Sequence, residues 1–306
     1  MTTTEGAPRA EAGSPRRELS EVLVHRRTGD YHLLNLVAPT IANQARPGQF
    51  VALQPGLDRS FLLRRPFSIH RVERHGAGFG TLEIVFDVVG PGTAWLAEAK
   101  PHDMLDVIGP LGRSFSYPKT QRSCLLVGGG YGAAPLYFLA EELRARNKLV
   151  HMVIGARDHG RVFKPIEAKR LAATVVVTTE DGTMGERGRV TDVLDALLER
   201  TGAQVVYACG PNPMLRAVAE RCRDLQIPCQ VAVEEMMACG LGVCWTCVVP
   251  VIGMDSRGWW NVRSCVEGPV FNGARVWWDR WLGEAPPPPA EEPAPEREAE
   301  RVQASP

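Results

Sequence analysis

The chain has 306 residues, of which 44% are hydrophobic and 23% charged, as in ordinary globular proteins. Lys and Arg together number 35, as do Asp and Glu, and this balance gives no indication of nucleic acid or an anionic membrane as a partner. No apolar run is long enough to span a bilayer, and the first residues lack a secretion signal, so we expect a cytoplasmic protein. In that reducing compartment, clustered cysteines are more often metal ligands or catalytic groups than disulfides.

Composition and the spacing of apolar residues divide the chain into segments. Residues 1–17 and 283–306 are rich in Ala, Pro and charged residues without periodicity, which predicts a disordered extension at each end. Residues 18–118 hold short, β-branched apolar runs separated by Gly and Pro turns. This pattern predicts an antiparallel six-stranded β-barrel with one helical stretch at 93–99.

From residue 119 to 233 the pattern changes to a repeated order of predicted strand, glycine turn and helix. Short apolar strands that alternate with amphipathic helices predict a parallel, Rossmann-like sheet covered on both faces. Ligands of such sheets bind at the carboxyl ends of the strands. The expected fold class is therefore multi-domain β plus α/β, with a small C-terminal domain over residues 234–282.

Two turns at predicted strand ends are candidate nucleotide sites. The glycines of Gly128–Gly132 would let the backbone approach a diphosphate at a helix N-terminus, although such turns also occur for packing. Cys209-Gly210-Pro211 occupies the same place after a later strand. A buried thiol and a proline in the first helical turn would explain those residues without any ligand.

Two segments of the predicted barrel are candidate cofactor sites. Arg65-Pro66-Phe67-Ser68 combines a guanidinium, an aromatic ring and a hydroxyl, which together can hold a phosphate and a flat heterocycle. The alternative is a solvated arginine beside a core phenylalanine. Gly92 and Thr93 begin the helical stretch, where Thr93 is the expected cap and free N–H groups could face a phosphate.

Four cysteines near the C-terminus carry the most specific pattern. Cys239, Cys244 and Cys247 have the C-x₄-C-x₂-C spacing of plant-type [2Fe-2S] ligands, and Cys265 follows after seventeen residues. No histidine occurs between residues 160 and 306, which argues against a Rieske centre and against zinc sites with histidine ligands. A Cys₄ zinc site remains the alternative to the cluster.

Taken together, these segments resemble the ferredoxin-NADP⁺ reductase superfamily and, within it, the electron-transfer subunits of class B dihydroorotate dehydrogenases. The resemblance covers residues 18–282. It rests on PGQFVAL (47–53), RRPFSI (64–69), VVGPGT (88–93), GPLG (109–112), GGGYGAAPL (128–136), TEDGTMGERGRVTDVL (179–194), YACGP (207–211), and CGLGVCWTC with CVEGPVF.

The resemblance implies three cofactors and their residues, with no side chain acting as a catalytic acid. The positions that match FAD-binding residues of the family are Arg65, Pro66, Phe67, Ser68, Val85, Phe86, Asp87, Gly92 and Thr93. Those that would face NAD are Gly129, Gly130, Gly132, Cys209, Gly210 and Pro211. Those that would hold the [2Fe-2S] cluster are Cys239, Cys244, Cys247 and Cys265.

The resemblance also implies a partner, an FMN-containing catalytic subunit that oxidises dihydroorotate in pyrimidine biosynthesis, in a heterotetramer with two copies of each chain. Electrons would pass through the cluster and FAD to NAD⁺. The alternatives are the small subunit of an NADH-dependent ferredoxin:NADP⁺ oxidoreductase or of sulfide dehydrogenase, and more distantly a nucleotide-sensing module with a structural Cys₄ zinc. A self-contained oxygenase reductase is disfavoured because residues 247 to 265 leave no room for a full ferredoxin domain.

Two positions leave details open. Tyr131 replaces the aliphatic residue that is usual in this glycine turn of the family, which could alter how a nucleotide docks. After the second parallel strand, Arg157 could meet a 2′-phosphate and Asp158 a ribose hydroxyl, so these two residues do not decide between NADP and NAD.

Overall fold

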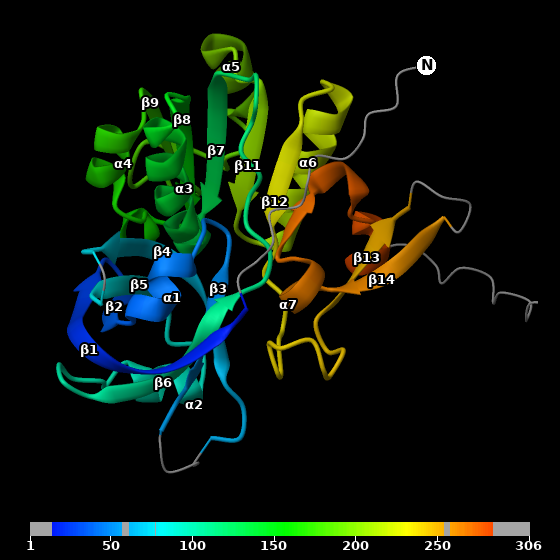
Figure 1. Cartoon of the computed structure of the whole chain (residues 1–306). Coiled ribbons are helices and arrows are strands. Elements are labelled where there is room, and N and C mark those ends of the chain that lie inside the picture. The colour runs from blue at the N-terminus through cyan, green and yellow to red at the C-terminus, as the bar shows by residue number, and fades with distance from the viewer. Residues whose placement is uncertain (1–13, 57–60, 77, 254–257, 284–306) are drawn as a thin grey trace, which may run out of the picture.

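The computed structural model describes residues 14–56, 61–76, 78–253 and 258–283. Most of the two predicted extensions lies outside these residues. The first strand begins at Arg16, so Arg16 and Arg17, which were expected to be disordered, are part of the barrel. Figure 1 shows the barrel below, the nucleotide sheet above it, and the C-terminal segment along one side of both.

The predicted six-stranded antiparallel barrel is confirmed. Its strands close in the order β1-β2-β5-β4-β3-β6. Alternate apolar side chains such as Leu34, Val51 and Ile69 are fully buried inside it. The helix α1 (Pro39–Gln44), which packs Ile41 into this core, was not predicted, and α2 (Pro91–Leu96) replaces the helix expected at 93–99. The strands are β1 (Arg16–Thr28), β2 (Tyr31–Val37), β3 (Phe50–Gln54), β4 (Arg65–Arg74), β5 (Gly80–Phe86) and β6 (Met104–Leu111).

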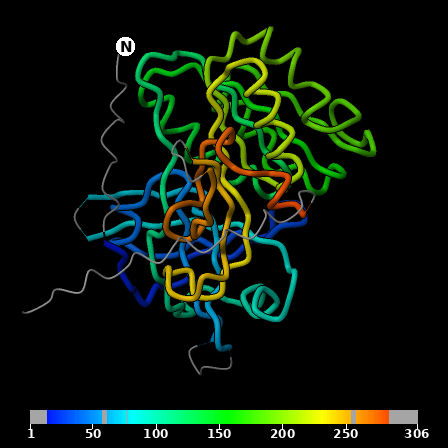
Figure 2. The backbone as a smooth tube through the Cα atoms, turned by 90° about the vertical axis from the view of Figure 1, so that its right-hand side faces the viewer, coloured from blue at the N-terminus to red at the C-terminus, as the bar shows by residue number. Residues whose placement is uncertain are grey.

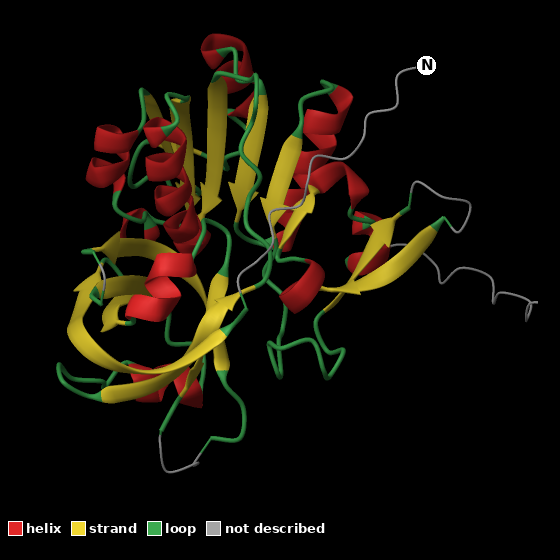
Figure 3. Cartoon of the chain, viewed as in Figure 1, coloured by secondary structure: helices red, strands yellow, loops and turns green. Residues whose placement is uncertain are grey.

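The predicted parallel sheet is also present. Its strand order is β10-β9-β8-β7-β11-β12-β15, parallel throughout except for the edge strand β15. Apolar faces of α3 (Ala134–Ala145) and α4 (Pro165–Leu171) cover one side, and those of α5 (Leu194–Thr201) and α6 (Asn212–Asp224) cover the other (Figure 3). The parallel strands are β7 (Ser123–Gly129), β8 (Leu149–Ala156), β9 (Thr174–Thr179), β10 (Glu186–Arg187), β11 (Val205–Cys209) and β12 (Cys229–Ala232).

The C-terminal segment joins both larger units. Its strand β15 (Val270–Asn272) pairs antiparallel with β12, so the nucleotide sheet includes residues from beyond its predicted limit at 233. Its hairpin buries Val249 and Val251 in the same apolar cluster as α6. In Figure 2 the segment lies across the junction, with its yellow loop beside the barrel. Its other elements are β13 (Val248–Ile252), β14 (Trp259–Arg263), α7 (Ser264–Glu267) and α8 (Trp278–Trp281).

The helices in the described part of the chain are too short or too polar to cross a membrane.

A buried histidine joins the barrel to the nucleotide sheet. His70, on β4, is fully buried; its Nδ1 donates to the carbonyl oxygen of Ala134 at 2.6 Å, and its Nε2 accepts from Lys164 Nζ at 3.0 Å. Burial, helped by the charge of Lys164, lowers the pKa of His70 to about 3. Next to it, Arg71 pairs with Glu141 at 2.6 Å, which ties the barrel to α3. The hydrogen bonds of His70 and the ion pair of Arg71 therefore fix the two units to each other.

The neutral His70 predicts a pH-dependent stability. The folded protein keeps His70 unprotonated, whereas the unfolded chain protonates it near pH 6.5, so the free energy of unfolding should fall as the pH drops from 7.5 to 5.5. The His70 contribution to that fall is about 1.4 kcal/mol. His70→Gln offers a donor to Ala134 and an acceptor to Lys164 but does not titrate. Its free energy of unfolding should therefore fall about 1.4 kcal/mol less than that of the wild type over the same pH range. Urea unfolding at both pH values measures the difference, and equal pH dependence of the two proteins would refute the prediction.

Candidate functional site

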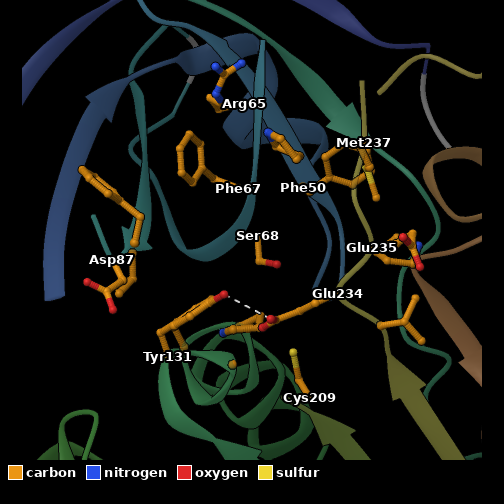
Figure 4. Close-up of a pocket in the computed structure, with 18 of the residues that line it drawn as sticks. Phe50, Arg65, Phe67, Ser68, Asp87, Tyr131, Cys209, Glu234, Glu235 and Met237 are labelled. Carbon is orange, nitrogen blue, oxygen red and sulfur yellow. Dashed lines mark hydrogen bonds between the residues drawn. The ribbon is translucent and has the colours of Figure 1, made fainter. Parts of the chain in front are cut away.

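Two cavities lie where the barrel meets the sheet. The first, here called the barrel cavity, has a volume of about 270 Å³ and is bounded by β4, β5, the first glycine turn and residues 233–237 (Figure 4). The second, the sheet cavity, has a volume of about 510 Å³ and lies at the carboxyl ends of β7, β8 and β11. The sheet cavity is thus at the edge where parallel sheets bind ligands.

Nearly all residues predicted to hold FAD come together in the barrel cavity. Its lining combines cationic, aromatic and hydroxyl groups, as the binding of a phosphate and a flat ring requires. Phe50 and Met237, which the sequence analysis missed, complete its wall. The predicted residues in the lining are Arg65, Pro66, Phe67, Ser68, Val85, Phe86, Asp87 and Thr93.

Gly92 stands behind this lining. A Cβ atom at Gly92 would lie 2.5 Å from Nε of Arg65, so the absence of a side chain lets the guanidinium pack against the turn. Thr93 is not the helix cap that we expected. Gly90 is the N-cap of α2, and Thr93 Oγ1 accepts hydrogen bonds from the backbone N–H groups of Val89 at 2.9 Å and Gly90 at 3.1 Å.

The two predicted nucleotide turns touch each other. A Cβ atom on Gly132 would lie 2.6 Å from Cα of Gly210, so these glycines are needed for close packing of the turns. Gly129, Gly130 and Pro211 line the sheet cavity. Gly132 and Cys209 line the barrel cavity instead, and Gly210 lies between the turns without being part of either lining. The predicted NAD residues are therefore distributed over both cavities.

The residues after β8 differ in role. Arg157 lines the sheet cavity together with Arg189 and Glu180. Asp158 does not; its Oδ1 accepts a hydrogen bond from the N–H of Gly160 at 2.9 Å and begins the turn 159–161. The carboxylate that we considered for a ribose hydroxyl is thus occupied by its own backbone.

Glu234 is a site residue that sequence reasoning missed. It follows β12 directly, and its carboxylate accepts a hydrogen bond from the Tyr131 hydroxyl at 3.1 Å (Figure 4). The place of Glu234 just beyond a parallel strand was the available signal, because ligands bind at that edge. Nearby, Arg161 of the sheet cavity pairs with Asp87 of the barrel cavity at 3.0 Å.

The loop of Cys239 and Cys244 aims hydrogen-bond donors at sulfur. The backbone N–H groups of Leu241 and Val243 donate to Cys239 Sγ at 3.3 and 3.4 Å. The Thr246 hydroxyl donates to Cys244 Sγ at 3.2 Å, and hydrogen bonds, first among them this one, lower the pKa of Cys244 to about 6. Donors of this kind stabilise thiolates, which are the form that binds iron.

Cys247 and Cys265 are buried against the outside of the barrel. They share an apolar cluster with Phe50 and Leu111, and burial, with the neighbouring Cys247, raises the pKa of the Cys265 thiol to about 12. Gly242 brings the cysteine loop to this cluster: it has φ of +83°, and a Cβ atom there would lie 2.5 Å from Val266 Cγ2.

The four cysteines differ in their surroundings. Cys239 and Cys244 lie in the loop, Cys247 and Cys265 lie in the apolar cluster against the barrel, and all eight cysteines of the chain are free. Within the described ranges, no three or more His, Cys, Asp or Glu side chains gather as a single set for one metal ion. A [2Fe-2S] cluster takes four thiolates for two irons, and the four cysteines of this segment are the number that it needs.

Family profiles match two parts of the chain. The profile for the iron-sulfur cluster binding domain of dihydroorotate dehydrogenase B matches residues 234–277, and that for the oxidoreductase NAD-binding domain matches residues 126–220. The electron transfer subunit of dihydroorotate dehydrogenase B (NAD(+)) from Desulforamulus reducens is 38% identical over 242 residues, which are 79% of this chain and 90% of that protein. Its counterpart from Geobacillus kaustophilus is 39% identical over 260 residues, 84% of this chain and 95% of that protein.

This chain belongs to the dihydroorotate dehydrogenase B electron-transfer subunits. Membership confirms the predicted cofactors, FAD, NAD and a [2Fe-2S] cluster, and an oxidoreductase subunit that works with a catalytic partner. The assignment of individual residues to these cofactors stays a prediction from the geometry above.

Solved structures with the same fold include more distant electron carriers. The structure of an NADH-dependent reduced ferredoxin-NADP oxidoreductase has a TM-score of 0.75 and 30% identity, and the match covers 87% of this chain and 92% of that one. The ferredoxin reductase of carbazole 1,9a-dioxygenase has a TM-score of 0.61 and 26% identity, with 71% of this chain and 68% of that one covered.

Gly92 gives a test of the FAD assignment in this electron-transfer subunit. Gly92→Ala places a methyl group 2.5 Å from Arg65 Nε, so the guanidinium should shift and FAD affinity should fall about tenfold, through loss of a charge-assisted contact. Gly90→Ala is the matched control, because no atom lies within 4 Å of a Cβ there. Titration of the deflavinated protein with FAD measures both. Equal affinities for the two variants would remove Arg65 from the FAD site.

Proposed function

We propose that this chain carries electrons from a dihydroorotate-oxidising subunit to NAD⁺, in the step of pyrimidine biosynthesis that forms orotate. The observation that carries the proposal is the composition of the barrel cavity, which barrel, nucleotide sheet and cysteine segment all line. Met237 lies in that lining two residues before Cys239, while Cys209 enters it from the sheet edge. One cavity therefore stands within reach of both the nucleotide and the cluster cysteines.

FAD, when bound, supplies the conversion between the hydride of NAD, which is two electrons together, and the single electrons that a [2Fe-2S] cluster carries. The residues of the chain hold and shield it. Arg65 supplies a cation for phosphate, and Phe50 and Phe67 supply apolar ring faces. Met237 and Pro269 exclude water on the side toward the cysteines.

The catalytic partner is proposed to be an FMN-containing subunit, with two copies of each chain in a heterotetramer and a cytoplasmic location. The curated relatives are named electron transfer subunits, which supports a division of labour between two chains. Exposed apolar side chains around Cys244 support docking on that side, because such patches mark interaction surfaces. They are Met236, Leu241, Val243 and Trp245.

A second candidate is the small subunit of an NADH-dependent ferredoxin:NADP⁺ oxidoreductase, which the structural likeness to such an enzyme favours. The first proposal is favoured because this chain is 38% identical to a named dihydroorotate dehydrogenase B subunit and 30% identical to that oxidoreductase. The two differ in their partner. Reduction of NAD⁺ by dihydroorotate supports the first, and ferredoxin-linked exchange between NADH and NADP⁺ without dihydroorotate turnover supports the second.

The central experiment is co-expression with a dihydroorotate-oxidising subunit. We expect dihydroorotate to reduce NAD⁺ only when both chains are present. Cys265→Ser should abolish this coupling and the cluster absorption while the flavin bands remain, because Ser removes one of four thiolates. Cys222→Ala, which removes a buried thiol from α6, is the control and should retain coupling. Coupling that survives in Cys265→Ser would refute the cluster as the bridge.

The docking surface has its own test. Val243 is 78% exposed, and Val243→Asp should weaken the complex by about 2 kcal/mol because a carboxylate would be buried without a partner. Ile166→Asp changes a similarly exposed side chain on α4 and should leave the affinity unchanged. Calorimetric titration of one subunit with the other measures both. Equal losses in the two variants would contradict docking at the cysteine loop.

A further inference from the structure

The two cavities have a shared wall. Of the described residues that line them, Tyr131 and Glu234 belong to both linings. These same two residues are joined to each other, because the Tyr131 hydroxyl donates to Glu234 Oε2 at 3.1 Å. The wall between the cavities therefore includes the hydrogen-bonded pair Tyr131–Glu234 (Figure 4), and the ion pair of Arg161 with Asp87 joins the two linings beside it.

The backbone beside Glu234 is tied to the C-terminal segment, whereas the Tyr131 ring is partly exposed at the edge of Tyr31. Glu234 follows Val233, whose N–H donates to the carbonyl oxygen of Pro269 at 3.0 Å, so its backbone is held by the C-terminal segment. Tyr131 is 38% exposed, and its ring meets the edge of Tyr31 with the centroids 5.9 Å apart at 71°. The side chain of Tyr131 can thus leave the wall by rotation once its hydrogen bond is broken.

Hydride transfer between NAD and FAD requires the two reacting rings to meet, and the shared wall of the cavities lies between their sites. This argument rests on the function proposed above. A hydride passes only when the two reacting rings approach to about 3–3.5 Å between the reacting atoms. The linings of the two cavities share Tyr131 and Glu234, so a dinucleotide whose diphosphate lies in the sheet cavity passes these side chains where it enters the barrel cavity. In the position described, the tyrosine ring stands in that path.

We propose that Tyr131, latched by Glu234, is a positioning residue that the nicotinamide half of the dinucleotide must displace to reach the flavin. The adenylate half binds in the sheet cavity without moving the latch. The latch therefore reduces the affinity for the whole dinucleotide and leaves that for the adenylate half unchanged. An aliphatic residue at this position, which the resemblance gives as usual, carries no hydroxyl and makes no such latch.

The expected size follows from population shift. If the competent state is the one with Tyr131 released, the apparent affinity is reduced by the fraction of molecules in that state. Removing one hydrogen bond of ordinary net strength raises that fraction about two- to tenfold. A residue that only packs in the wall would change the binding of both halves alike, or of neither.

The test compares two ligands on the complete complex with its cofactors. Tyr131→Phe keeps the ring and removes the hydroxyl, so the dissociation constant for NAD⁺, which cannot reduce the oxidised flavin, should fall about two- to tenfold when measured by protein fluorescence. The dissociation constant for ADP-ribose, which has no nicotinamide, should stay at the wild-type value. Glu234→Ala should behave as Tyr131→Phe does, and Glu234→Gln, whose amide oxygen still accepts the bond, should remain close to the wild type.

Tyr117→Phe is the matched control, because Tyr117 lines neither cavity and its ring packs under Arg146 at 3.9 Å. It should bind both ligands as the wild type does. The proposal is wrong if Tyr131→Phe binds NAD⁺ as the wild type does, or if the dissociation constants for NAD⁺ and ADP-ribose change by the same factor. A failure of the proposed function looks different: NADH would not reduce the flavin of the wild-type complex at all.

Discussion

The pairing of β15 with β12 is the constraint on which the site depends. This three-residue strand anchors the C-terminal segment to the edge of the nucleotide sheet, with Ala232 opposite Val270. Immediately before it, the carbonyl oxygen of Gly268 accepts the N–H of Arg113 at 2.6 Å, which fastens the same segment to the end of the barrel. Without both attachments, Pro269 would not close the barrel cavity and the cysteine loop would have no fixed distance from it.

The same attachments give the four cysteines unequal surroundings. Cys247 and Cys265 are almost fully buried against the barrel, whereas Cys244 is exposed. Cys247 and Cys265 therefore lie beside Phe50, which also lines the barrel cavity, while Cys244 faces solvent. An electron carrier needs this polarity, since one end of the site must meet a second chain while the other stays dry beside the flavin.

Much of this arrangement could be predicted because its signals are local. The spacing of apolar residues predicts the barrel and the sheet, and the spacing of Cys239, Cys244 and Cys247 predicts the cluster. The misses have a common physical cause. Helix α1 and strand β15 are too short to show a period, and they form only against distant partners. Glu234 gained its role from Tyr131, which is 103 positions away, and no sequence pattern expresses such a contact.

The glycine turn also shows why a large side chain can stand at Tyr131. A Cβ atom at Gly128 would lie 2.6 Å from Ala133, one at Gly129 would lie 2.7 Å from Met214, and Gly132 meets the second turn. These positions cannot carry side chains, because backbone and neighbouring residues already fill the space. Position 131 points instead to the boundary between two cavities, where volume remains. A change there alters the path between the cavities without disturbing the turn, so ligand passage can vary while the fold and its cofactor sites stay constant.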